Sequence, residues 1–107
     1  MSLKTISDKA FSKSVWVLTK QIPRGKVTTY SLLAKALKKP RAFRAVGNAL
    51  NKNPYAPIVP CHRVVRSNGQ VGGFASGSTN KIKLLRSEGV MIAKQKVQEL
   101  EKFLYHF

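Results

Sequence analysis

Apolar residues near the N-terminus recur at intervals of three and four residues, which predicts an amphipathic helix with one buried face. Ser7 or Asp8 can cap the start of this helix. Pro23 and Gly25 close it, because proline cannot continue a helix and glycine favours its end. The expected buried positions are Phe11, Val15, Trp16, Leu18 and Ile22.

Residues 26–29 favour a short strand, and two short helices follow them. Ser31 can cap the first helix, which Pro40 ends, and the second is expected over residues 41–51. Two short helices joined by a tight turn, the second of them basic, predict a helix-turn-helix. The expected core positions are Leu32, Leu33, Ala36 and Leu37 in the first helix and Ala42, Phe43, Val46, Ala49 and Leu50 in the second.

The second of these helices carries little side-chain bulk at Ala45, Gly47 and Ala49, while Arg44 and Asn48 point away from the core. Small residues let a helix backbone approach a nucleic-acid groove closely. They serve helix packing just as often, and the pattern alone leaves both interpretations open.

Proline and Asn-Gly signals divide the middle of the chain. Residues 53–57 are too rich in proline for a helix or a central strand and predict an ordered loop. The Asn-Gly pair at residues 68–69 stands between apolar segments at residues 64–65 and 71, which predicts a β-hairpin.

Two more helices are expected after the hairpin. Thr79 caps the first, which buries Ile82 and Leu85 and ends at Gly89. The second lies within residues 91–107 and serves packing. Its apolar positions are Val97, Leu100, Phe103, Leu104 and Phe107.

These elements together predict a small α/β domain, mainly helical, that spans residues 1–107 as one unit. A chain of 107 residues can bury one core without disulfides or metal ions. No signal peptide or apolar run of membrane-spanning length is recognisable, and a single cysteine cannot form an internal disulfide. We therefore expect no membrane association and an intracellular, reducing compartment.

Charge is the strongest signal in the composition. The chain has 20 Lys and Arg against 4 Asp and Glu, a formal net charge of +16, and no acid between Asp8 and Glu88. Cations that neutralise phosphates release condensed counterions, so a polyanion is the natural partner. Charge does not by itself distinguish DNA, RNA, a membrane surface or the solvated surface of an acid-adapted or ribosome-associated protein.

Cys61 is the only cysteine and stands between Pro60 and His62, with Arg63 next. A lone cysteine among apolar residues is most often an inert core residue. A neighbouring imidazole and cation instead favour a nucleophilic thiolate. A metal site is not expected, because the chain has one cysteine and two histidines, and His106 lies at the C-terminus.

The string Pro-Cys-His-Arg-Val-Val at residues 60–65 resembles the active-site signature of the O6-alkylguanine-DNA alkyltransferases, the methylated-DNA protein-cysteine methyltransferases. The resemblance covers about residues 11–90, the C-terminal active domain of that family. Further matching segments, in the family's order and spacing, are GKVTTY at residues 25–30, RAVG at 44–47, NP at 53–54, Gly72 and EG at 88–89.

The resemblance implies roles for five residues around the thiol. Cys61 is the acceptor of the alkyl group, His62 is the base that takes the thiol proton through a water, and Glu88 orients His62. Tyr30 donates a hydrogen bond toward the guanine ring, and Asn53 is a hinge that ties the recognition helix to the active-site strand. The residues alone also allow a core tyrosine at position 30 and an exposed helix-end carboxylate at position 88.

The resemblance also implies how DNA is held. Arg44 enters the duplex and fills the space of the extruded nucleotide, although a surface arginine on a phosphate is the plainer alternative. The backbone of Val64 recognises guanine's exocyclic amine, and the loop from Gly72 walls the pocket. Phosphates are gripped mainly by Arg41, Lys52 and Arg66, while Ala45 and Gly47 bring the recognition helix close to the minor groove.

The sequence departs from the family at three points. No N-terminal domain with its zinc site is recognisable, Phe74 stands where many members have Tyr, and Ala75 replaces a frequent Ser. Stacking on the flipped base is retained, but a hydroxyl contact is lost.

From the resemblance we expect a monomeric, cofactor-free protein that binds double-stranded DNA containing O6-alkylguanine and moves the alkyl group irreversibly to Cys61. Two alternatives stay open. One is a lesion-binding relative that extrudes the base without reacting and recruits excision repair, although such proteins have Trp or Ala in place of the cysteine. The other is a helix-turn-helix regulator with an incidental cysteine.

Overall fold

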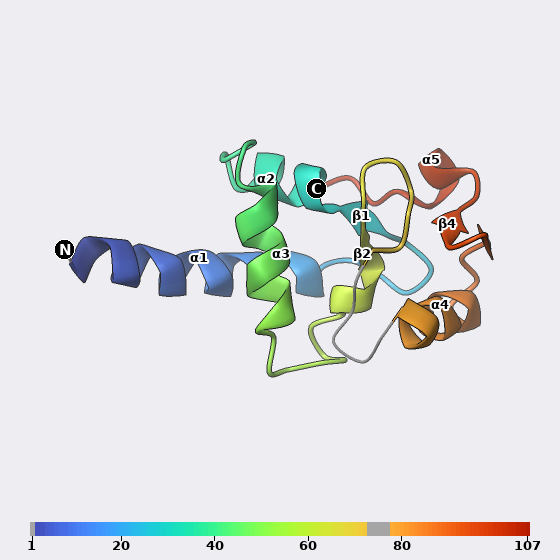
Figure 1. Cartoon of the computed structure of the whole chain (residues 1–107), viewed down its shortest axis with the longest axis horizontal. Helices are drawn as coiled ribbons and strands as arrows, with labels where there is room; N and C mark the ends of the chain where they lie inside the picture. The colour runs from blue at the N-terminus through green and yellow to red at the C-terminus, as the bar shows by residue number, and fades with distance from the viewer. Residues whose placement is uncertain (1, 73–77) are drawn as a thin grey trace.

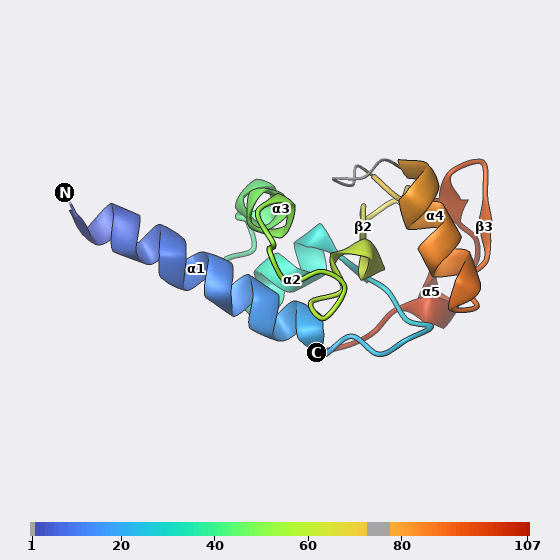
Figure 2. The ribbon, with the colours of Figure 1, turned by 90° about the horizontal axis from the view of Figure 1, so that it is seen from below.

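The computed structural model describes residues 2–72 and 78–107. Three helices form its first half: α1 (Ser2–Lys20), α2 (Tyr30–Ala36) and α3 (Phe43–Asn51). The N-terminal end of α1 projects beyond the other elements, while α2 and α3 pack along it nearer its C-terminal end (Figures 1 and 2). The expected pair of short helices after residues 26–29 is therefore present.

The ends of these helices differ from the expected ones. The N-cap of α2 is Thr29, whose hydroxyl accepts the Leu32 N–H at 3.1 Å, so the expected cap at Ser31 is wrong. Thr29 takes the cap position because it ends a strand and has the extended conformation that an N-cap residue requires. The helix α1 begins at Ser2, before the expected caps, and α3 begins at Phe43, whose side chain is 45% exposed and does not face the core.

Two short parallel strands organise the centre of the fold. β1 (Thr28–Thr29) pairs with β2 (Val64–Val65), with Thr28 opposite Val64 and Thr29 opposite Val65. Successive residues of a strand point to opposite faces, and the two valines accordingly join different cores. The first core contains Val15, Ile22, Leu33, Ala34, Val46, Ala49, Leu50 and Val64. The second contains Val27, Val65, Val71, Leu85, Val90, Ile92 and Val97.

The expected hairpin around residues 68–69 forms its turn but not its strand pairing. The Arg66 N–H donates to the Gln70 carbonyl at 2.8 Å, which closes the turn. β2 nevertheless pairs with β1, and Gln70 bridges to Lys96. The strand pairing expected from the sequence is wrong, because β2 packs one valine into each of the two cores. The Asn-Gly turn signal carries no information about this packing.

The last segment also differs from the expected packing helix. After α4 (Ser78–Ser87), the chain forms an antiparallel hairpin of β3 (Ile92–Ala93) and β4 (Lys96–Val97), then the single-turn helix α5 (Leu100–Phe103). Ile92 and Val97 are buried in the second core, and Leu104 forms a parallel bridge with Val27. Packing on an existing core has therefore overridden the helical spacing of the apolar residues.

We predict that Leu85→Ala lowers the free energy of unfolding by about 3 kcal/mol, because it opens a cavity in the second core. Leu85 is fully buried in α4, whereas its neighbour Leu84 is 38% exposed. The matched control Leu84→Ala should cost less than about 1 kcal/mol. Urea denaturation of both variants measures the difference, and equal losses would contradict the orientation of α4.

Candidate active site

Cys61 lies in η1 (Cys61–Arg63), a single turn of 3-10 helix between the proline-rich loop and β2. The Cys61 N–H donates to the Val59 carbonyl at 2.9 Å, which fixes the entry to this turn. The cysteine is free and half-buried, and it packs against the same core cluster as Tyr30. The cysteine residue is therefore partly accessible to solvent.

His62 and Arg63 both contact the carboxylate of Glu88, which follows α4. His62 Nε2 lies 3.1 Å from Glu88 Oε2. Arg63 donates from Nε to Oε1 at 2.9 Å and from Nη2 to Oε2 at 2.6 Å, and its Nη1 donates to the Ile22 carbonyl at 2.8 Å. One carboxylate thus joins the turn that carries the thiol to the end of α4, and Arg63 extends the network to the segment after α1.

The turn that follows α1 packs closely on the residue that supplies this carboxylate. Gly25 has φ +85°, and a Cβ built there would lie 3.1 Å from the Glu88 carbonyl oxygen. Arg24 Nη2 also donates to the Ser87 carbonyl at 3.0 Å. A side chain at position 25 would strain the backbone and push against the end of α4.

The electrostatics of the network favour a neutral imidazole and an ionised carboxylate. Burial lowers the pKa of His62, and the cations Arg63 and Lys81 add to this effect, although Glu88 opposes it. Burial acts to raise the pKa of Glu88, but hydrogen bonds from Arg63 and His62 outweigh it and lower that pKa. Neutral His62 can accept a proton, and a hydrogen bond to Glu88 fixes its tautomer.

Asn53 connects the end of α3 to the segment before the thiol. Its Nδ2 donates to the Val59 carbonyl at 2.9 Å, and its Oδ1 accepts the Tyr55 N–H at 2.9 Å. These contacts have the geometry of the expected hinge.

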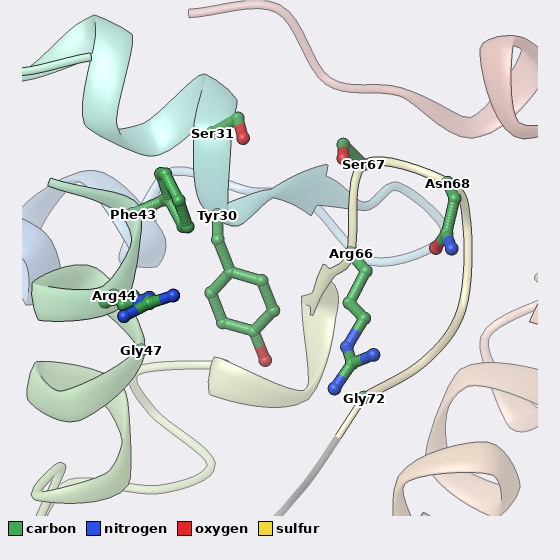
Figure 3. Close-up of a pocket in the computed structure, with 9 residues that line it drawn as sticks. All are labelled: Tyr30, Ser31, Phe43, Arg44, Gly47, Arg66, Ser67, Asn68 and Gly72. Atoms are coloured by element: carbon green, nitrogen blue, oxygen red, sulfur yellow. The ribbon is translucent and has the colours of Figure 1, made fainter. Parts of the chain in front are cut away.

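A cavity of about 520 Å³ opens between α2, α3 and the segment that follows β2. It lies where the parallel strands end, since Tyr30 follows β1 and Arg66 follows β2. Figure 3 shows the Tyr30 ring in the middle of the cavity, with Arg44 and Arg66 on opposite sides of it. The lining consists of Tyr30, Ser31, Phe43, Arg44, Gly47, Arg66, Ser67, Asn68 and Gly72.

Two glycines, Gly72 and Gly47, lie next to the Tyr30 ring. Gly72 has φ +73°, and a Cβ there would lie 3.5 Å from the Tyr30 hydroxyl oxygen. A Cβ at Gly47 would lie 3.9 Å from the same ring, in ordinary contact. Cys61 is not part of this lining, but it packs against the same core cluster as Tyr30. Phe74 and Ala75 lie outside the described residues.

A buried lysine on α4 was not expected from the sequence. Ile82, which was expected to be buried, is only half-buried. Lys81 is 1% exposed, and its Nζ donates to the Val64 carbonyl at 2.7 Å. Burial lowers its pKa to about 8, while Cys61 acts to raise that pKa. Its position four residues before Leu85 indicates the inner face of α4, but the carbonyl that accepts from its amine is set by how α4 docks.

The remaining candidate DNA contacts lie outside the cavity. Arg41, Ala45 and Lys52 are exposed. Arg41 lies with Lys39 on the turn between α2 and α3, beside a shallow hollow. On α3, Arg44, Ala45 and Asn48 are exposed, whereas Gly47 is half-buried and Ala49 belongs to the first core.

Within residues 2–72 and 78–107, no cluster of three His, Cys, Asp or Glu is arranged to hold a metal ion. In the same part of the chain, no helix combines the length and apolarity needed to cross a membrane.

Known proteins resemble the chain in both sequence and structure. Residues 10–90 match the family described as 6-O-methylguanine DNA methyltransferase, DNA binding domain. A methylated-DNA--protein-cysteine methyltransferase of Methanosarcina acetivorans is 53% identical over 79 residues, which are 74% of this chain and 51% of the relative. The chain spans about half the length of this relative and of those from Methanosarcina mazei and Methanosarcina barkeri.

Two solved structures bound to DNA share the fold. Mycobacterium tuberculosis OGT in complex with DNA has a TM-score of 0.71 and 41% identity, covering 73% of this chain and 48% of that one. S. pombe Atl1 in complex with DNA containing O6-carboxymethylguanine has a TM-score of 0.80 and 28% identity, covering 91% and 95%. These similarities confirm the mainly helical α/β fold expected from the sequence. The chain belongs to the 6-O-methylguanine DNA methyltransferase family and carries its DNA binding domain.

Proposed function

We propose that this protein repairs DNA by moving an alkyl group from O6 of guanine to the sulfur of Cys61. The observation that carries the proposal is the hydrogen bond between His62 and Glu88 beside a half-buried free thiol. The relatives named methylated-DNA--protein-cysteine methyltransferases and the neighbours bound to DNA support the same reaction class.

The reaction begins with proton transfer from the thiol to neutral His62 through a water, with Glu88 stabilising the imidazolium that forms. The thiolate attacks the alkyl carbon in line with its bond to O6. A carbon–sulfur bond forms, the carbon–oxygen bond breaks, and its electron pair stays on guanine, which takes up one proton. Tyr30 donates a hydrogen bond to the ring as charge develops there. Because a thioether does not revert, each molecule acts once.

The target nucleotide leaves the duplex to reach the thiol, because O6 is inaccessible within the base stack. The cavity of about 520 Å³ has the size of a small-ligand site and lies beside Arg44. Arg44 fills the space left in the duplex, and the carbonyls of Cys61 and Val64 recognise guanine's amine. The hinge at Asn53 keeps α3 and the thiol segment in register during this exchange.

DNA is gripped mainly through its phosphates. Arg41 and Lys52 are exposed beside α3, and the net charge of +16 attracts any duplex with little sequence preference. We infer that the protein is a monomer and needs no cofactor. We also infer that it acts in the cytoplasm beside the nucleoid or, in a eukaryote, in the nucleus.

We predict that one methylene per molecule is added to the wild-type protein by an oligonucleotide containing O6-methylguanine, with the addition mapped to Cys61 by mass spectrometry. Cys61→Ser should abolish the addition and keep lesion binding, since a hydroxyl is a far weaker nucleophile. Unchanged wild-type mass with tight lesion binding would favour the non-reacting lesion binder. Unchanged mass with tight binding to one particular sequence would favour a regulator.

We predict that Glu88→Gln slows alkyl transfer by about tenfold or more and moves the acid limb of its pH–rate profile to lower pH. Glu88 acts to raise the pKa of His62, so its loss lowers that pKa further and weakens the base. Single-turnover rates between about pH 4 and pH 8 measure both effects. Glu101→Gln removes an exposed carboxylate and should change neither; a Glu88→Gln profile that keeps its wild-type midpoint would refute the role of Glu88.

We predict that Arg44→Ala slows repair of an O6-methylguanine duplex by about tenfold or more, because extrusion then lacks its space-filling side chain. The reaction with the free base O6-methylguanine needs no extrusion and should change far less. Lys83→Ala, which removes an exposed cation outside the cavity, serves as the control for net charge. Equal slowing of both substrates by Arg44→Ala would argue against extrusion.

A further inference from the structure

Arg66, which the sequence predicts to be a phosphate contact, is exposed and also lies at the wall of the cavity beside Tyr30. The parallel register places Thr29 opposite Val65, so Tyr30 and Arg66 are the next residues along the two chains. Figure 3 shows the Arg66 guanidinium extending alongside the Tyr30 ring toward Gly72. A Cβ at Gly72 would lie 3.5 Å from the Tyr30 hydroxyl oxygen and 3.7 Å from Arg66 Cγ, so both side chains converge on this glycine.

Three cations surround the Tyr30 ring. Arg44 approaches from α3, Arg66 from the segment after β2, and Lys81 from α4, with Nζ 5.8 Å from the ring centroid. Cys61 packs against the same core cluster as this ring. Burial raises the pKa of Tyr30, the charge of Arg66 lowers it, and a charge on Cys61 raises it. Arg66 is therefore a cation whose effect on the Tyr30 pKa opposes that of burial, which is larger, and that of a thiolate at Cys61.

We propose that Arg66 is a positioning residue that acts through Tyr30, making the phenol a stronger hydrogen-bond donor to the departing guanine. This inference rests on the proposed function. As the carbon–oxygen bond breaks, its electron pair moves onto guanine. A Tyr30 phenol beside the Arg66 cation is a stronger hydrogen-bond donor than the same buried phenol without the cation, and it stabilises that charge more. The proton that the thiol loses is held on His62, and the proton that guanine gains comes from solvent water.

The plain alternative is that Arg66 only holds a phosphate. The two roles differ for a substrate without phosphates: a phosphate contact contributes nothing to reaction with free O6-methylguanine, whereas an effect through Tyr30 persists. Arg66→Met keeps the length of the side chain and removes its charge, and Arg66→Lys restores a cation. Lys83→Met is the matched control, because Lys83 is an exposed cation outside the cavity.

The test measures single-turnover rates with the free base for Arg66→Met, Arg66→Lys, Lys83→Met and Tyr30→Phe, and for Arg66→Met combined with Tyr30→Phe. We expect Arg66→Met to slow the reaction about three- to tenfold, with Arg66→Lys recovering most of the loss. Lys83→Met should have no effect. In the Tyr30→Phe background, Arg66→Met should add no further loss, because the group through which it acts is gone.

An unchanged free-base rate in Arg66→Met, together with weaker duplex binding, would overturn the inference in favour of a phosphate contact. A full further loss in the Tyr30→Phe background would show that Arg66 acts independently of Tyr30. Failure of the proposed function looks different, because the wild-type protein would then leave Cys61 unmodified by both substrates. Phenolate absorbance, compared with and without the Tyr30→Phe change, reads the tyrosine directly: its pKa should rise in Arg66→Met, and no rise would also contradict the inference.

Discussion

The short parallel pairing of Thr28–Thr29 with Val64–Val65 holds the site together. It brings the tyrosine that begins α2 beside the segment that carries the thiol, although these lie far apart in the chain. It also separates the two cores, with Val64 in one and Val65 in the other. A slip of one residue in this pairing would exchange these faces, so both cores fix the register on which the cavity depends.

The helix α4 holds the thiol segment at two points. Lys81 donates to the Val64 carbonyl near the start of the helix, and Glu88 binds His62 and Arg63 just after its end. These residues are seven apart, close to two helical turns, so both face the same side. In a chain with so few acids, Glu88 is neutralised by Arg63 and fixes His62, and the same contacts that stabilise the fold set the chemistry of the site.

The three helices of the first half, and the contact between His62 and Glu88, were predicted from the sequence better than the rest. The helical periodicity and the isolation of Glu88 among basic residues were both visible in the sequence. The sequence did not show that Arg63 is the main partner of Glu88 or that the Lys81 amine is buried, because both contacts depend on how α4 docks. The pairing of β2 and the form of residues 91–107 were wrong for the same reason: short segments take their structure from the cores they cover.

We propose that Cys61 accepts the alkyl group beside Tyr30. Carbon-13 NMR of the protein after reaction with a duplex that carries O6-methylguanine, labelled on the methyl carbon, tests this most directly. We expect one S-methyl signal per molecule, with cross-peaks to the Tyr30 ring protons. A label that stays entirely in the DNA, or an S-methyl signal without contact to that ring, would contradict it.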